Sequence, residues 1–286
     1  MATETSTSGY VTVADGVRLR YWQDGPVSGP NIVFVPGWVQ TAAQFRKQVE
    51  HFKATFRVTT YDHRGHGESD KPSFGYRVSR LAADLATLLA HLDLRDAVLV
   101  GHSMGAAVLW SHWDLFPGDR DRITKLVFID QAPCMTIDPS WSPEQAAEVG
   151  ALFTASQRFD IATGLRGPEW KEAWSGVSRS FFTAEAEPAD LEWVLAQQMK
   201  ASRESAAALI ADHIALDYRD IIPRISVPTL TVAGRGSLFP TAGAEWIGKQ
   251  TGGRVEIFEK EEGGSHSMFW ENPEKFNGIL GEFLSA

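Results

Sequence analysis

The sequence predicts an α/β fold with a doubly wound, mostly parallel eight-stranded sheet and a helical lid inserted after the sixth strand. Short, nearly continuous apolar runs rich in Val, Ile and Phe indicate strands that are covered on both faces of the sheet. These runs alternate with longer segments of helical periodicity, as in doubly wound folds. The alternation stops between Pro133 and Pro228, where helical patterns follow one another with few strand-like runs.

The predicted strands begin with an antiparallel pair. Residues Tyr10–Val13 and Val17–Trp22 flank Asp15-Gly16, a dipeptide typical of a tight hairpin turn. Six further strands follow, and helical segments between them favour parallel pairing. Their ranges are Asn31–Val35, Phe56–Tyr61, Ala97–Val100, Leu126–Ile129, Thr229–Ala233 and Val255–Phe258.

Helical periodicity is clear at Val78–Leu92, where leucines recur at about 3.6-residue spacing. A long helical insertion after a sheet strand is interpreted as a lid over the carboxyl ends of the strands, where α/β proteins bind ligands. The predicted division is therefore 1–134 for the first part of the core, 135–220 for the lid and 221–286 for the second part of the core. Helical runs in the lid are expected at Pro143–Gln157, Pro168–Phe182, Pro188–Met199 and Arg203–Leu216.

The composition of the 286 residues is that of an ordinary globular chain, with 43% hydrophobic and 22% charged residues. The net charge of -9 and the scattered basic residues argue against nucleic acid or an anionic membrane as a partner. No apolar run is long enough to cross a bilayer. Cys134 is the only cysteine, and residues 1–9 lack the features of a signal peptide. We therefore expect a cytoplasmic protein, and a homodimer is compatible with this composition.

The strongest motif is the Gly-His-Ser-Met-Gly segment at residues 101–105. It lies between the strand Ala97–Val100 and the helical run Ala106–Phe116, which is the strand–turn–helix setting of a G-x-S-x-G nucleophile elbow. The glycines allow strand and helix to approach closely, so that Ser103 is held exposed on a sharp turn. The helix N-terminus points N–H groups at negative charge that develops there. Ser103 is therefore the candidate nucleophile.

His266 is the candidate general base, because a serine hydroxyl near neutral pH needs one. It follows the last predicted strand and a loop with two glycines, and a closing helical segment comes after it. The chain order of serine, acid and histidine is the one expected for an elbow of this kind.

Three further segments make the chain resemble α/β-hydrolase-fold proteins over nearly its whole length. Residues 35–38 (Val-Pro-Gly-Trp) stand where such proteins have an oxyanion loop. Residues 62–69 match the D-x-R-G-x-G-x-S turn of the serine esterase, perhydrolase (non-haem haloperoxidase-like) and lactonase branch, and Gly264-Ser265-His266 matches its C-terminal histidine segment. The resemblance implies an oxyanion hole made by the backbone N–H groups of Trp38 and Met104, and it implies no cofactor.

The acid of the triad departs from the family pattern. Ser237 occupies the usual position, three residues after Gly234 in the loop beyond the seventh strand, and no carboxylate lies near it. Asp130, at the end of the sixth strand, is the alternative, and some relatives place their acid there. We therefore expect Asp130 to be the partner of His266. The other interpretation makes Asp130 a loop-bracing residue, with His266 oriented by Ser237 or a water.

The resemblance to serine hydrolases implies a carboxylic ester or lactone as substrate. The aromatic residues of the lid favour an apolar or aromatic group on that substrate, and no metal is expected. His63 and His66 belong to the family turn, so that a structural role is expected for them. The side chains predicted to contact substrate are His102, Met135, Trp141, Trp170, Trp174 and Phe239.

Two other functions remain open at this stage. Cofactor-independent 2,4-dioxygenases of 3-hydroxy-4-quinolones share this fold, and they have a similar Pro-Gly-Trp loop and an acid at the position of Asp130. In that group the His–Asp pair deprotonates the substrate, and the serine only positions it. A non-catalytic ligand receptor would keep the same three residues and bind its ligand under the lid.

Overall fold

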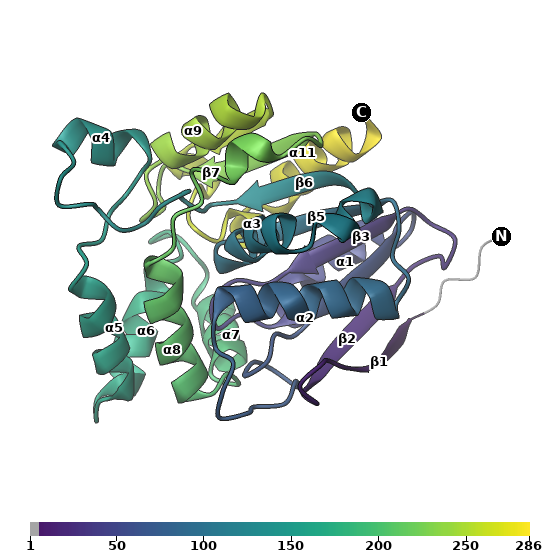
Figure 1. Ribbon diagram of the computed structural model, residues 1–286, viewed down its shortest axis with the longest axis horizontal. Helices are drawn as coiled ribbons and strands as arrows, with labels where there is room; N and C mark the ends of the chain where they lie inside the picture. The colour runs from purple at the N-terminus through teal and green to yellow at the C-terminus, as the bar shows by residue number, and fades with distance from the viewer. Residues whose placement is uncertain (1–5) are drawn as a thin grey trace.

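The computed structural model describes residues 6–286 and contains an eight-stranded sheet with the strand order β1-β2-β4-β3-β5-β6-β7-β8 (Figure 1). Strands β1 and β2 form an antiparallel pair, β2 pairs antiparallel with β4, and the remaining neighbours are parallel. The predicted eight-stranded, mostly parallel sheet is thus confirmed. The strands are β1 Thr7–Thr12, β2 Arg18–Asp24, β3 Asn31–Val35, β4 Arg57–Tyr61, β5 Ala97–His102, β6 Ile123–Ile129, β7 Thr229–Gly234 and β8 Arg254–Phe258.

The central strands owe their position to their unbroken apolar sequences. Every residue of β5 and of β7 is buried, as expected for strands covered on both faces by helices. The hairpin between β1 and β2 is closed by a hydrogen bond from the Val13 N–H to the Val17 carbonyl (2.9 Å), and Gly16 has a φ of +84° that favours glycine.

The core helices follow the strands and cover the sheet. Helix α2 packs on α3, and α1 packs on α11 near the C-terminus. Their bounds are α1 Arg46–Phe52, α2 Val78–His91, α3 Met104–Leu115, α9 Ala242–Thr251, α10 Met268–Glu271 and α11 Pro273–Ser285, with 3₁₀ turns at Ala42–Phe45, Pro117–Arg122, Ile222–Arg224 and Lys260–Glu262.

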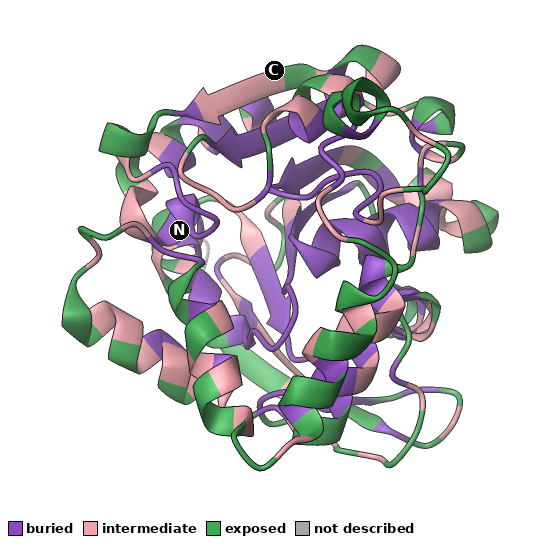
Figure 2. Ribbon diagram, turned by 90° about the vertical axis from the view of Figure 1, so that its left-hand side faces the viewer, coloured by how far each residue is buried: buried purple, intermediate pink, exposed green. Residues whose placement is uncertain are grey.

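Five helices lie between β6 and β7 in the described chain, and we call them the helical insertion. Figure 1 shows α5 to α8 gathered at the end of the sheet that lies away from the two chain termini. In Figure 2, which looks onto this end, buried segments lie at the centre, and the helices around them carry exposed residues. The helices are α4 Pro143–Glu148, α5 Gln157–Arg166, α6 Trp170–Arg179, α7 Pro188–Gln198 and α8 Arg203–Ile214.

One predicted helix of the insertion is wrong. The run Pro143–Gln157 was expected to be a single helix, but α4 ends at Glu148 and a new helix begins at Gln157. Between them Gly150 adopts a φ of +68°, and Phe153 pairs with Thr136 in a short β-bridge. Gly150 directly follows the C-cap residue of α4, a position where a left-handed glycine commonly ends a helix, and a Cβ atom on it would come within 3.0 Å of the Gly243 nitrogen at the start of α9.

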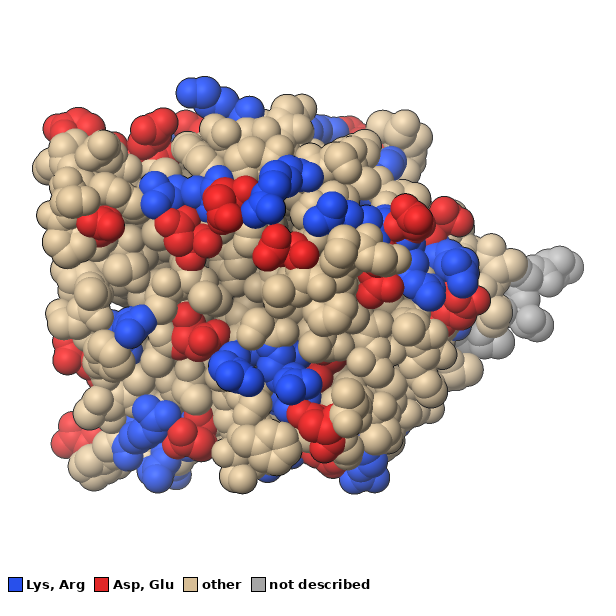
Figure 3. All heavy atoms as spheres, in the orientation of Figure 1, with Lys and Arg blue, Asp and Glu red and all other residues tan. Residues whose placement is uncertain are grey.

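The surface agrees with the charge distribution of the sequence. On the face drawn in Figure 3, Lys and Arg side chains are interspersed with Asp and Glu side chains. Within residues 6–286, no helix combines the length and apolarity needed to cross a membrane.

Candidate active site

Ser103 sits on the turn between β5 and α3 with φ +53° and ψ −123°. This strained backbone is enforced from both sides. A Cβ atom on Gly101 would come within 2.6 Å of the Gly105 carbonyl carbon, and one on Gly105 within 2.2 Å of the Val35 carbonyl oxygen. The Ser103 N–H donates to the Ile129 carbonyl (2.8 Å). Strain of this kind persists only where the surroundings over-determine it, and here it presents the serine side chain at the end of the sheet.

His266 and Asp130 are buried and hydrogen-bonded to each other. His266 Nδ1 lies 2.6 Å from Asp130 Oδ2. With Nδ1 engaged by a carboxylate, Nε2 is the ring nitrogen left to exchange a proton with a hydroxyl. Ser103, Asp130 and His266 follow β5, β6 and β8, so that their loops meet at the carboxyl ends of the parallel strands.

Asp130 has a backbone as unusual as that of Ser103. Its φ is +50°, and its N–H donates to the Val232 carbonyl at 2.8 Å. The carboxylate accepts three hydrogen bonds: from His266, from the Ser237 hydroxyl (2.5 Å) and from the Gly234 N–H (3.3 Å). Ser237 therefore contacts the acid, and the sequence did not suggest this bond. A side-chain hydroxyl after β7 helps to orient a carboxylate supplied by β6.

Two backbone N–H groups close to Ser103 in the chain or in space have no hydrogen bond within the described residues, one in the loop at residues 36–39 and one at the start of α3. Among the hydrogen bonds of residues 6–286, none is donated by the N–H of Trp38 or of Met104. Met104 is the first residue of α3, where an N–H has no partner inside the helix. Val39 is held at φ +54°, and its N–H donates to His66 Nε2 at 3.1 Å.

The histidines of the 62–69 turn act as structural braces. His63 Nε2 lies 2.8 Å from the Pro36 carbonyl oxygen, and His66 Nδ1 lies 2.9 Å from the Arg64 carbonyl oxygen. Both rings are fully buried, and burial lowers the pKa of His63 to about 3 and that of His66 to about 4. They are therefore neutral near pH 7, which suits their hydrogen bonds to Pro36 and Val39 in the loop at residues 36–39.

Ser103 opens into a cavity of about 250 Å³ between the sheet and the helical insertion. Of the side chains predicted to contact substrate, Met135 and Phe239 line this cavity, and so does Trp38. The wall is otherwise almost entirely apolar, and the insertion supplies most of it. The remaining lining residues are Phe153, Ile161, Val177, Ser180, Phe181, Ile210, His213, Ile214 and Leu238.

Four of the residues predicted to contact substrate lie outside this lining. His102 is fully buried, with ring nitrogens 2.9 Å from Gln40 Oε1 and 2.8 Å from the His266 carbonyl oxygen. Trp174 is buried in a stack on Trp38 (5.9 Å between ring centroids), and Trp170 packs on Trp174.

The fourth, Trp141, carries the Arg219 guanidinium over its ring at 4.3 Å. Aromatic content alone did not distinguish packing of the insertion from lining of the cavity.

Two residues that line the cavity were not predicted from the sequence, and each contacts His266 or the residue after Asp130. Phe181 packs on the His266 ring with 4.6 Å between centroids, and its carbonyl accepts the Ser267 N–H at 3.0 Å. His213 lies 3.2 Å from Gln131, the residue after Asp130. A usable signal for His213 was its place between Ile210 and Ile214 on one face of a helical run.

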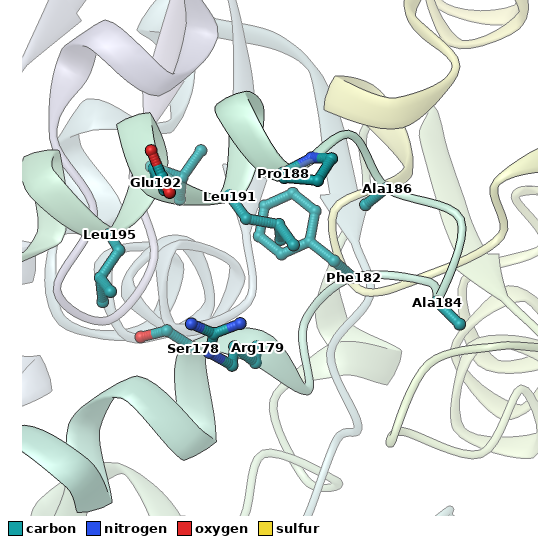
Figure 4. Close-up of a pocket in the computed structure, with 10 residues that line it drawn as sticks. Ser178, Arg179, Phe182, Ala184, Ala186, Pro188, Leu191, Glu192 and Leu195 are labelled. Atoms are coloured by element: carbon teal, nitrogen blue, oxygen red, sulfur yellow. The ribbon is translucent and has the colours of Figure 1, made fainter.

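A second hollow of about 230 Å³ lies between α6 and α7 (Figure 4). Ser178, Arg179 and Phe182 line it from the α6 side, and Leu191 and Leu195 line it from α7. The catalytic candidates do not line this hollow, and all of its lining residues belong to the chain between β6 and β7.

Comparison with known proteins agrees with this geometry. A family model described as "Alpha/beta hydrolase family" matches residues 32–279. A non-heme chloroperoxidase of Streptomyces lividans is 29% identical, over 97% of this chain and 100% of its own length. A bifunctional esterase/perhydrolase of Acinetobacter calcoaceticus is 28% identical, over 79% of this chain and 81% of its own. An esterase structure from Exiguobacterium antarcticum shares the fold, with a TM-score of 0.88 at 23% identity, and covers 98% of this chain and 100% of its own.

Proposed function

The chain belongs to the alpha/beta hydrolase family, and from that premise we propose that it is a serine hydrolase that cleaves a carboxylic ester or lactone with an apolar or aromatic group. The observation that carries the proposal is the site at the carboxyl ends of β5 to β8. There Ser103, on a strained elbow, opens into an apolar cavity, and a buried His266–Asp130 pair lies on neighbouring loops. An esterase/perhydrolase among the relatives supports the same reaction class.

The proposed reaction passes through an acyl-serine. Ser103 Oγ attacks the substrate carbonyl carbon while His266 Nε2 takes its proton, and the Asp130 carboxylate stabilises the imidazolium that forms. The N–H groups of Trp38 and Met104 donate to the oxyanion. His266 then returns the proton to the leaving alcohol, and a water activated by the same histidine hydrolyses the acyl group from Ser103.

The cavity limits the substrate to a group of moderate size. A dry cavity of about 150 Å³ accommodates benzene, so that about 250 Å³ suits an aryl ring or a short alkyl chain. Its described lining contains no Asp, Glu, Lys or Arg to neutralise a charged group, and a buried unpaired charge is costly. An apolar ester is therefore preferred to a small charged one.

Two observations favour a second candidate, the cofactor-independent 2,4-dioxygenase of a 3-hydroxy-4-quinolone. In the described residues the Ser103 hydroxyl has no hydrogen-bond partner, and the acid follows β6 and not β7. A serine that only positions substrate needs no bond to the histidine. Ser–His contacts are also often long in ligand-free hydrolases and tighten with substrate, which leaves hydrolysis the better-supported function.

A test that separates the two reactions uses an aryl phosphonate and a panel of aryl esters, lactones and a 3-hydroxy-4-quinolone, with and without oxygen. A hydrolase should turn over esters or lactones anaerobically. The phosphonate should add the mass of one phosphonyl group to the peptide that contains Ser103, and it should stop turnover. A dioxygenase should consume oxygen and release carbon monoxide from the quinolone. Ring cleavage at a rate equal to or above the best ester turnover would replace the proposed function.

A further inference from the structure

Of the described residues that line the cavity, four carry side-chain nitrogen or oxygen atoms: Trp38, Ser103, Ser180 and His213. Trp38 Nε1 donates to the Ala206 carbonyl at 2.8 Å, and Ser180 Oγ donates to the Val177 carbonyl at 2.7 Å. Ser103 Oγ is the reacting atom. Of the remaining lining residues in the described chain, His213 is the one with side-chain nitrogen or oxygen atoms, and its Nδ1 is buried without a hydrogen-bond partner.

The hydrogen bonds around His213 determine which ring nitrogen carries the hydrogen. Gln131 Nε2 donates to the Ala132 carbonyl at 3.0 Å, which orients the amide so that its oxygen lies 3.2 Å from His213 Nε2. An amide oxygen only accepts, so the hydrogen must be on Nε2 and Nδ1 must present a bare lone pair. Burial also lowers the pKa of His213 to about 3, which keeps the ring neutral and preserves this tautomer near pH 7.

An unpaired buried acceptor is unfavourable for the protein alone. His213 is 3% exposed and lies between Ile210 and Ile214, which line the same cavity from α8. A leucine at this position would complete the apolar wall without an unpaired atom. The nitrogen is explained if a ligand supplies the missing donor.

We propose that His213 Nδ1 accepts a hydrogen bond from a hydroxyl or N–H group of the substrate, which makes His213 a specificity-determining residue and Gln131 its positioning residue. The inference rests on the proposed function and narrows its substrate class. The preferred ester or lactone carries one hydrogen-bond donor on the otherwise apolar group that fills the cavity.

The test compares aryl esters of phenylacetic acid with those of its ring-hydroxylated and ring-methoxylated derivatives, with each ring position scanned. One hydrogen bond of this kind changes kcat/KM by about three- to tenfold. At least one hydroxylated ester should exceed both the parent and its methoxy counterpart by that factor. The gain should appear mainly in KM, because the contact is made in the ground state and the transition state alike.

Two variants test whether the preference for hydroxylated esters depends on His213 Nδ1. In His213→Phe, kcat/KM for the hydroxylated ester should fall to that for the parent ester. In His213→Asn, which keeps an acceptor oxygen near the Nδ1 position, part of the preference for the hydroxylated ester should remain. Ser178→Ala, in the second hollow, is the matched control and should leave the preference unchanged. A preference that survives in His213→Phe, or the absence of any preferred hydroxylated ester in the wild type, would overturn the proposal.

Equilibrium binding separates failure of this proposal from failure of the proposed function. The same esters are titrated calorimetrically into Ser103→Ala and into Ser103→Ala/His213→Phe, and melting curves confirm that both are folded. A hydroxyl preference in Kd that depends on His213, with no ester turnover by the wild type, would refute the hydrolase function alone. Ester turnover without any hydroxyl preference in Kd or KM would refute the role of His213 alone.

Discussion

The sheet core and the helical insertion differ in how completely their residues are buried, and this difference separates chemistry from substrate choice. In β5 every residue is buried, whereas in α5 only Ala162 and Leu165 are. The core holds Ser103 and Asp130 at positive φ through contacts on all sides. The insertion instead places the ends of apolar side chains around a cavity. A rigid core can position reacting atoms closely, while side chains of the insertion determine the shape of the cavity.

The largest expected effect lies in the core. Ser103→Ala should lower ester turnover by about 10⁶-fold, because the acyl-enzyme can no longer form. Its urea midpoint should stay close to that of the wild type, since the serine hydroxyl has no hydrogen bond in the described structure. Steady-state kinetics and urea titration measure the two quantities. Turnover above a tenth of wild type would show that the core does not supply the nucleophile.

The second expectation concerns how the core orients its base. Asp130→Asn should lower turnover by about 10³- to 10⁴-fold, because the imidazolium loses its charged partner and His266 loses control of its tautomer. Ser237→Ala removes one hydrogen bond to the same carboxylate and should cost far less. The ratio of kcat values for the two variants is the measurement. If kcat falls further in Ser237→Ala than in Asp130→Asn, with folding unaltered, Asp130 is not the triad acid.

The third expectation uses the titration of His213 to compare the two regions. Burial lowers its pKa to about 3 from an ordinary 6.5, so that between these values the unfolded chain binds a proton that the folded chain does not. Stability is therefore lost as the pH falls through 6.5 towards 3, by about 2 kcal/mol from this histidine between pH 7 and pH 5. His213→Gln should show a correspondingly smaller acid destabilisation in urea titrations at pH 7 and pH 5.

The same substitution at His63, a buried histidine of the sheet core whose pKa is also about 3, is the control for a histidine outside the insertion. If the insertion unfolds separately from the sheet, the His213 contribution will appear in the local opening of α8 and not in global unfolding. If stability changes with pH equally in the wild type and in His213→Gln, both in global unfolding and in the local opening of α8, the ring is not buried in its neutral form.

The smallest expected effect tests the insertion as a lid. Backbone amides of residues 135–220 should exchange hydrogen faster than those of β3, β5 and β7, because fewer of their side chains are buried. An aryl phosphonate on Ser103 should slow exchange in α6 and α8, which line the cavity. Hydrogen-exchange mass spectrometry measures both. A profile that does not change with the inhibitor would remove the proposed lid role.

The prediction from sequence succeeded where the signal is local. The six strands from β3 to β8 were recognised as short runs rich in apolar residues. Strands β3, β5 and β7 are buried along nearly their whole length, whereas β8, at the sheet edge, is mostly half-buried. The break after α4 was missed. A local signal for it was present, because Gly150 adopts a positive φ directly after the C-cap residue of α4.

The candidate site was likewise predictable from the sequence only where its residues are close together in the chain. The elbow could be identified because its two glycines and serine are adjacent in the chain. The partner of His266 was a choice between two places, and the 2.6 Å contact joins it to Asp130 while Ser237 contacts the carboxylate. Trp141, Trp170 and Trp174 were placed near substrate on composition alone, which does not say which way an aromatic ring faces.

By itself the sequence determined the α/β class, the elbow at Ser103 and the position of His266 after the last strand. These depend on periodicity and on residues that are neighbours in the chain. Only the tertiary structure decided which acid meets His266, which insertion residues line the cavity, and that His213 is left with an unpaired nitrogen. Each of these is set by contacts between segments far apart in sequence, where a side chain's direction depends on the packing of both partners.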